Sequence, residues 1–177
     1  MNHRKHFVVI FVIFTVFIVL ALSCASSGGV KTPTPEFNVT YEYESETPAI
    51  SVIVEPVWGV SFNDWGIEQF QCKFSNNTNA IAKVVWEGSS LYYDGNSYLP
   101  CIDGQKYVDV NTPMVAAIIP RQGILEKSVY SSDQFRYGNY KQTIEANPVQ
   151  IIFQIDSENG SEYVVINVSY SEATNPS

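Results

Sequence analysis

The cysteines and histidines of this chain are the residues with the most recognisable chemistry. The cysteines are Cys24, Cys72 and Cys101, and the histidines are His3 and His6. A cysteine thiol can carry a lipid, form a disulfide or bind a metal, whereas histidine is the usual proton carrier near neutral pH. The segments that hold these five residues therefore decide which reactions the chain can support.

An apolar segment leads directly to Cys24. A short basic stretch, Asn2 to His6, precedes a run from Phe7 to Leu22 in which Thr15 is the one polar residue. This layout is typical of a secretory signal. As a helix the run would be about 24 Å long, which is short for a hydrocarbon core of about 30 Å.

The residues before Cys24 resemble the bacterial lipobox, the processing motif of lipoproteins. In that motif the cysteine thiol receives a diacylglycerol, a peptidase cuts before the cysteine, and the new amino group can take an acyl chain such as palmitate. The resemblance implies that Ser23 precedes the cut and that Cys24 is the lipidated first residue, although Ala21 stands where leucine is commonest. The alternative is an uncleaved anchor helix with an incidental cysteine. Either way we expect the folded part to lie outside the cytoplasm.

Cleavage after Ser23 would remove both histidines. A chain without imidazole has no Ser-His-Asp triad, no Cys-His pair and no HExxH zinc site. Loss of Arg4 and Lys5 would also change the formal net charge from −8 to −10, which argues against a nucleic-acid partner. We therefore expect a protein that is not an enzyme, with no catalytic residue, no metal site and no cofactor other than the covalent lipid on Cys24.

Cys72 and Cys101 are expected to form a disulfide. Outside the cytoplasm a pair of cysteines is most simply a disulfide. It would close a loop of about 30 residues and stabilise the fold by roughly 3 to 4 kcal/mol. The alternative is a pair of buried thiols.

Composition divides the chain into four segments. We expect a lipoprotein signal peptide over residues 1–23, a flexible tether over 24–48, a β-sandwich domain over 49–172 and a disordered tail over 173–177. The tether is rich in Ser, Gly, Thr, Pro and Glu, a composition typical of solvated linkers. Its stretch YEYESE has two alternative interpretations, as an acidic edge strand or as a partner-binding motif.

Short apolar segments separated by turn signals fill the chain from Ala49 onward. In EQFQCKF every second residue is apolar, which predicts a half-buried strand. Asp94-Gly95 predicts a tight hairpin turn, and VQIIFQID and SEYVVINVSY predict a final hairpin around SENG. Pro56 moves the first strand toward a sheet edge or a bulge. Many short strands of this kind indicate an all-β fold, an antiparallel sandwich.

The block from Phe74 to Phe135 contains several short motifs in a fixed order. They are Trp86-Glu87, the Asp94-Gly95 hairpin, GQKYVDVNTP over 104–113, and IPRQG over 119–123. In this order they resemble a domain of poorly characterised bacterial envelope lipoproteins. The resemblance implies an immunoglobulin-like β-sandwich and an envelope location, and it brings no activity. Cys101 lies outside the resembling pattern, which therefore gives the disulfide no support.

The segment WGVSFNDWG is the candidate ligand-binding site. Trp58, Asn63, Asp64 and Trp65 are expected on one loop, where exposed aromatic rings can stack on sugars beside polar groups. Aromatic residues at strand positions more often pack in the core, and Trp86, between valines and Glu87, is expected to do so.

For two further sets of residues with oxygen-bearing side chains, a structural role is favoured over a metal-binding or catalytic one. Asp103, Asp109 and Asn111 could approach a calcium ion, but the spacing fits no EF-hand, and such residues near Gly and Pro usually cap turns. The carboxylate pairs Glu42 with Glu44 and Asp156 with Glu158 are two residues apart, and we expect them to be solvated rather than to form a glycosidase pair.

The sequence as a whole predicts a lipid-anchored envelope protein whose domain binds another protein. The membrane would be contacted through the lipid, and the partner would be an envelope protein. The alternative is a binding module for glycan or peptidoglycan fragments that uses exposed aromatic residues, and a hydrolase that uses carboxylates ranks third. Ala25 lacks the acidic character that marks inner-membrane retention, so in a bacterium with two membranes we expect the outer membrane, with surface exposure as a further option.

Overall fold

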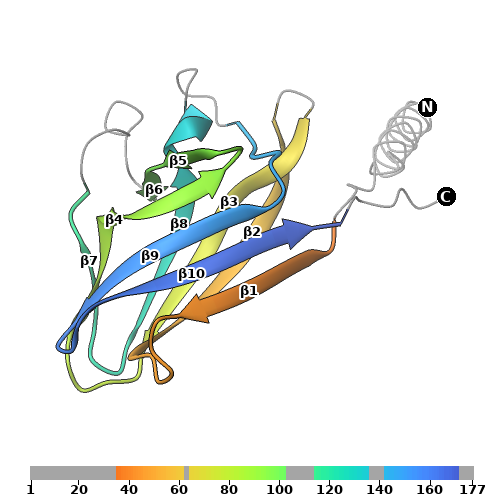
Figure 1. Ribbon diagram of the computed structural model, residues 1–177. Helices are drawn as coiled ribbons and strands as arrows, with labels where there is room; N and C mark the ends of the chain where they lie inside the picture. The colour runs from red at the N-terminus through yellow and green to blue at the C-terminus, as the bar shows by residue number, and fades with distance from the viewer. Residues whose placement is uncertain (1–34, 62–63, 103–113, 136–141, 172–177) are drawn as a thin grey trace, which may run out of the picture. The chain divides into compact units, whose positions relative to one another are not determined.

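The structure is a computed structural model that describes residues 35–61, 64–102, 114–135 and 142–171. These residues form the strands β1 to β10 and one short 3-10 helix, η2, and none of them lies in an α-helix (Figure 1). The predicted signal peptide, the lipidation site and the tail lie outside the described residues. The described part belongs to one compact unit within residues 34–177.

Two antiparallel sheets make up the fold. The larger sheet has the order β1-β10-β9-β4-β5, and β7 pairs with the start of β4, whereas β5 pairs with its end. The smaller sheet has the order β2-β3-β8-β6. The strands of the larger sheet are β1 (Phe37–Tyr43), β4 (Ala82–Tyr93), β5 (Asn96–Tyr98), β7 (Ala117–Ile119), β9 (Val149–Ser157) and β10 (Gly160–Tyr170). Those of the smaller sheet are β2 (Ile50–Ser61), β3 (Asp64–Asn76), β6 (Pro100–Ile102) and β8 (Ile124–Ser131), after which η2 spans Ser132–Phe135.

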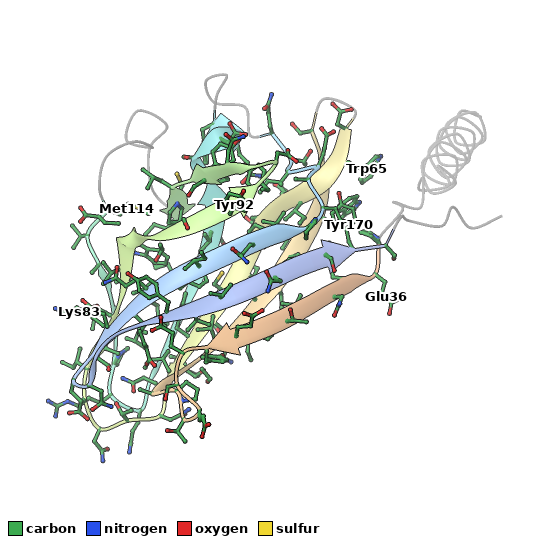
Figure 2. The ribbon with its side chains drawn as sticks, in the orientation of Figure 1. Glu36, Trp65, Lys83, Tyr92, Met114 and Tyr170 are labelled. Carbon is green, nitrogen blue, oxygen red and sulfur yellow. The ribbon has the colours of Figure 1, made fainter. Side chains whose placement is uncertain are left out.

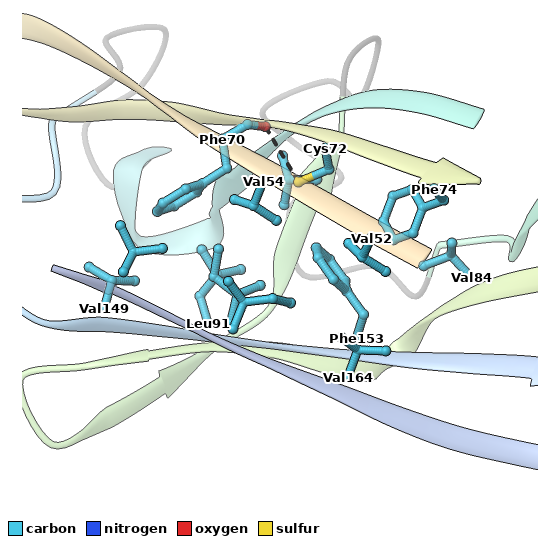
Figure 3. Packing of buried hydrophobic residues seen from close by; sticks show 14 of the residues in the cluster. Val52, Val54, Phe70, Cys72, Phe74, Val84, Leu91, Val149, Phe153 and Val164 are labelled. Atoms are coloured by element: carbon cyan, nitrogen blue, oxygen red, sulfur yellow. Dashed lines mark hydrogen bonds between the residues drawn. The ribbon is translucent and has the colours of Figure 1, made fainter. Parts of the chain in front are cut away.

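Alternating apolar residues turn one face of each sheet toward a shared core. In β3, Phe70, Cys72 and Phe74 are buried, while Gln69, Gln71 and Lys73 face the other side, so the predicted alternation is confirmed. These side chains meet apolar residues of β4, β9 and β10 (Figure 3). The predicted all-β fold with antiparallel sheets is likewise confirmed.

Trp86 lies at the centre of the core. It is 1% exposed, and its ring lies 6.3 Å from Phe74 and 6.2 Å from Phe153, both in edge-to-face geometry. Phe74 and Phe153 are themselves 5.0 Å apart, so three rings from both sheets contact one another. Such pairs add stabilisation beyond the area that they bury. The expectation that Trp86 is a core residue is confirmed.

The predicted turns connect the strands as expected. Asp94 and Gly95 have φ angles of 50° and 74°, the left-handed geometry of a two-residue hairpin turn, and they join β4 to β5. β9 and β10 form the predicted final hairpin. Pro56 lies in β2, an edge strand whose register shifts between Val57 and Trp58, so both the edge and the bulge are present.

The predicted tether over residues 24–48 is wrong for its second half. Residues Phe37–Tyr43 form β1, which pairs with β10 along its whole length. The alternative interpretation of YEYESE as an acidic edge strand is confirmed for residues 41–43, whereas residues 44–46 follow the strand. The reason is an alternation hidden by the polar composition: Phe37, Val39, Tyr41 and Tyr43 pack against the core, while Asn38, Thr40 and Glu42 face solvent.

Candidate functional site

Trp58 is held in the sandwich rather than on a loop. It belongs to β2, where it pairs with Ile67 of β3. Its indole ring packs edge-on against Phe37 at 6.1 Å and Tyr170 at 4.9 Å, and its Nε1 is buried without a hydrogen-bond partner among the described residues. We call Phe37, Trp58 and Tyr170 the aromatic triad. Because these contacts occupy the ring, Trp58 is poorly placed to stack on a sugar.

Trp65 and Asp64 begin β3 at the far end of the same hairpin. Trp65 pairs with Val60, which is 56% exposed, and is itself half-buried (Figure 2). Asp64 is exposed, and Asn63 lies outside the described residues. The single loop expected from Trp58 to Trp65 is therefore wrong, because most of the segment continues the two strands. The ligand-binding role stays a prediction for Trp65 and Asp64.

The disulfide expected between Cys72 and Cys101 is absent, and both residues are buried thiols. Cys72 lies on β3 opposite Lys127, whereas Cys101 lies on β6 opposite Tyr130. Strand β8 separates β3 from β6, so the two cysteines are about 10 Å apart across the sheet alone, beyond the reach of a disulfide. Positions 127 and 130 of β8 also point to opposite faces. Cys72 therefore enters the core and Cys101 does not.

Burial makes both thiols weak acids. Desolvation raises the pKa of the Cys72 thiol far above its ordinary value and raises the pKa of Cys101 to about 11. The thiolate is the reactive form of cysteine, so neither side chain is suited to nucleophilic chemistry at neutral pH.

The outer face of the larger sheet is broad and mixes polar, aromatic and aliphatic side chains. One row across the sheet runs from Thr40 through Asn167 and Gln150 to Tyr92, and the next from Glu42 through Val165 and Ile152 to Ser90. Tyr92 is 45% exposed, and Tyr163, farther along β10, is 39% exposed (Figure 2). We call these residues, with Tyr163, the outer face.

Side-chain hydrogen bonds fix the polar groups of the outer face. Gln150 Nε2 donates to Asn167 Oδ1 at 2.9 Å, and Asn167 Nδ2 donates to Glu42 Oε1 at 3.1 Å. Glu44 Oε2 accepts from the backbone N–H of Tyr163 at 3.1 Å. Glu42 and Glu44 thus accept hydrogen bonds on an exposed surface, as expected for solvated carboxylates rather than a catalytic pair.

The edge of β2 is covered by tyrosines of β1. The Tyr41 hydroxyl accepts from the backbone N–H of Val54 and the Tyr43 hydroxyl from that of Val52, both at 3.0 Å. Pro56, two residues beyond Val54, has no N–H. The edge of β2 therefore offers no unpaired donor at these three positions, which removes a template for strand addition. We call these contacts the tyrosine clasp.

A buried polar network joins the two sheets near η2. Tyr93 of β4 donates to Ser131 Oγ of β8 at 2.8 Å, and burial is the main cause that raises the pKa of Tyr93 far above its ordinary value. Gln134, 2% exposed, donates from Nε2 to the carbonyls of Glu68 and Gln142 at 3.0 and 2.8 Å, and its Oε1 accepts from the N–H of Ser131 at 2.8 Å. Sequence patterns did not single out Gln134, because the three residues before it, Ser131, Ser132 and Asp133, are polar.

The remaining candidates carry no described site. Asp103, Asp109 and Asn111 lie outside the described residues. Within the described ranges, no three His, Cys, Asp or Glu side chains gather closely enough to hold a metal ion. Nor does any helix in this part of the chain have the length and apolar character needed to cross a bilayer.

No protein-family model and no curated protein sequence matches the chain.

Proposed function

We propose that this protein is a lipid-anchored domain of the bacterial cell envelope that binds a protein partner and has no enzymatic activity. The outer face is the observation that carries the binding function. It combines exposed tyrosines with half-buried aliphatic residues and with polar groups already fixed by hydrogen bonds. Tyrosines supply much of the energy at protein interfaces, and polar groups that are already ordered lose little entropy on binding.

The charge of the domain points to the chemistry of the partner. Glu42 lies on β1, Glu44 directly follows this strand, and Glu87 is exposed on β4. The chain has a formal net charge of −8. Complementary potentials speed association and exclude wrong partners. A partner with basic residues around an apolar centre fits the outer face best.

An immunoglobulin-like topology is part of the proposal, and the strand order supports it. In immunoglobulin nomenclature, the order β2-β3-β8-β6 corresponds to A-B-E-D, and the order β10-β9-β4-β5 corresponds to G-F-C-C′. Trp86 then falls on strand C, the position of the buried tryptophan in that fold. The Phe74–Phe153 contact joins strands B and F, which a disulfide joins in antibody domains.

The anchor is proposed from the sequence before Cys24: a basic stretch, an apolar run, and Ser23 directly before the cysteine. Metabolic labelling with a fatty acid tests it. Wild-type protein should incorporate label and Cys24→Ala should not, and equal labelling of the two proteins would contradict lipidation.

Site-specific photocrosslinking in intact envelopes tests the binding face. A photoreactive phenylalanine replaces Tyr92 on the outer face or, as the matched control, Ile53, which is 48% exposed on the outer side of the other sheet. We expect a reproducible protein adduct from position 92 and none from position 53. Equal adducts at both positions would contradict the choice of face, and glycan-linked adducts would favour the alternative function.

A further inference from the structure

A hollow at the turn end of the sandwich combines charges of both signs. Its volume is about 350 Å³, and its lining includes Ile81, Lys83, Arg121, Asp156 and Glu158. These residues come from the β3–β4 connection, β4 itself, the β7–β8 turn and the end of β9 with its turn. Lys83 lies at the opposite end of the sheet from Glu36 and Tyr170 (Figure 2). The hollow is thus separate from the aromatic triad and the candidate Trp65.

The turn that carries Arg121 is fixed by its neighbours. Gln122 has a φ of 48°, which is uncommon for a residue other than glycine. Its N–H donates to the Thr78 carbonyl at 3.0 Å, and its Nε2 donates to Asn79 Oδ1 at 2.8 Å. Asn76, 2% exposed, ties the same turns together, because its N–H donates to the Gly123 carbonyl at 2.9 Å and its Nδ2 to the Ala80 carbonyl at 2.8 Å. The β3–β4 connection and the β7–β8 turn, which line two sides of the hollow, are therefore held in place by hydrogen bonds within the protein itself.

The cations of the hollow are available to a ligand. Among the described residues, Lys73 pairs with Glu126 at 3.8 Å on the other sheet, but neither Lys83 nor Arg121 forms an ion pair. Lys83 lies opposite Asp156 in the β4–β9 register. Asp156 Oδ1 instead accepts from Ser161 Oγ at 2.5 Å and from Gln154 Nε2 at 3.3 Å. The Asp156 carboxylate is thus hydrogen-bonded to neutral donors of the same sheet rather than to Lys83.

The pattern of charge selects the ligand. A simple anion would be repelled by Asp156 and Glu158, and a simple cation by Lys83 and Arg121. A molecule with a carboxylate and an ammonium group a few ångströms apart can place the carboxylate near the two cations and the ammonium group near the two carboxylates. Guanidinium groups bind carboxylates through two parallel hydrogen bonds, and a hollow of this size is in the range of small-molecule sites. We propose that the hollow binds a zwitterion of amino-acid or dipeptide size, its carboxylate on Arg121 and Lys83 and its ammonium group on Glu158.

Titration of the full-length protein in detergent with alanyl-alanine, followed by nuclear magnetic resonance, tests the proposal. We expect saturable shifts of backbone signals at residues 80–83, 121–123 and 156–158. The C-terminal amide and the N-acetyl form of the dipeptide each lack one charge, and both should bind about tenfold more weakly or worse. Absence of saturable shifts, or equal binding of the amide form, would overturn the proposal.

Variants then assign the charges. Arg121→Gln should weaken binding of alanyl-alanine about tenfold or more. Lys73→Gln, which removes a cation that is already paired on the other sheet, should leave the affinity unchanged. Since Arg121 is exposed at a turn, its substitution should leave the spectrum of the folded protein intact away from the turn. The assigned site would be contradicted if both variants weakened binding of alanyl-alanine equally, or if neither variant weakened it.

Discussion

The Tyr41 hydroxyl makes two hydrogen bonds to the backbone of Val54: it accepts from the N–H at 3.0 Å and donates to the carbonyl at 3.4 Å. Tyr43 does the same with Val52, at 3.0 and 3.3 Å. One strand of the larger sheet thereby closes the open edge of the smaller sheet. The hydroxyls of Tyr41 and Tyr43 thus join the two sheets, because the described residues of β1 and β2 form no strand pairing with each other.

Removal of the clasp hydroxyls should destabilise the fold. Tyr41→Phe and Tyr43→Phe each leave a backbone donor and acceptor unpaired, and we expect each to lower the free energy of unfolding by about 1 kcal/mol. The double variant should also self-associate, because the edge of β2 becomes available for pairing. Urea denaturation and analytical ultracentrifugation measure both effects. Tyr92→Phe, which alters an exposed tyrosine, is the control, and a double variant as stable and as monomeric as wild type would contradict the role of the clasp.

The two buried thiols should react with iodoacetamide once the protein is unfolded, without any reductant. Purified protein treated with iodoacetamide under native conditions should gain no label on Cys72 or Cys101, because burial raises the pKa of both thiols. In urea, without any reductant, both should be labelled, as mass spectrometry of peptides would show. Labelling that appears in urea only after a reductant is added would instead indicate a disulfide.

Stability should fall at alkaline pH. Burial raises the pKa of Cys72 in the folded state above its unfolded value, so both states are neutral below about pH 8. At higher pH the unfolded state loses a proton that the folded state keeps. The free energy of unfolding should then decrease by up to about 1.4 kcal/mol per pH unit for each such group. Urea denaturation between about pH 6 and pH 10 measures this slope.

A Cys72→Ala variant separates the contribution of this thiol from those of Cys101 and Tyr93, whose pKa values are also raised by burial. The variant should be less stable at neutral pH because it leaves a cavity, but its alkaline slope should be shallower. If the free energy of unfolding fell with pH equally steeply in the variant and in wild type, Cys72 would not contribute to the alkaline loss of stability.

Gly66 should tolerate no side chain. A Cβ atom at this position would lie 2.5 Å from the Ile144 carbonyl oxygen, and Ile67 and Ile144 exchange two backbone hydrogen bonds of 2.9 Å next to it. Gly66→Ala should therefore lower the free energy of unfolding by about 1 to 3 kcal/mol. Asn38→Ala, at an exposed position of β1, is the control, and an equal effect of the two substitutions in urea denaturation would refute the close approach.

Sequence patterns predict the parts of this fold that depend on neighbouring residues. Phe70, Cys72 and Phe74 alternate with polar residues, and that period alone indicates which side chains enter the core. The Asp94-Gly95 turn follows from the ease with which both residues adopt positive φ. The burial of Trp86 follows from the valines beside it.

The errors share a physical cause, which is contact between residues far apart in the chain. β1 looks like a linker by composition, because its four inward residues are separated by Asn, Thr and Glu and gain their stability from β10, more than a hundred residues later. Cys72 and Cys101 have a spacing that permits a disulfide, but strand order and facing direction exclude it. The ring of Trp58, which was expected on an exposed loop, packs against Phe37 and Tyr170, and only the folded sheets bring these residues beside it.

If Cys24 carries the proposed lipid, the position of β1 limits how far the domain can stand from the membrane. A tether that ended at residue 48 would allow up to about 85 Å between Cys24 and the sandwich, whereas a sandwich that starts at Phe37 allows at most about 45 Å. On the proposed anchor, the greatest height of the domain above the bilayer is thus roughly halved. The proposed partner should accordingly be sought in the layer of the envelope next to the lipid, and short-span crosslinkers to membrane-embedded proteins are the appropriate probes.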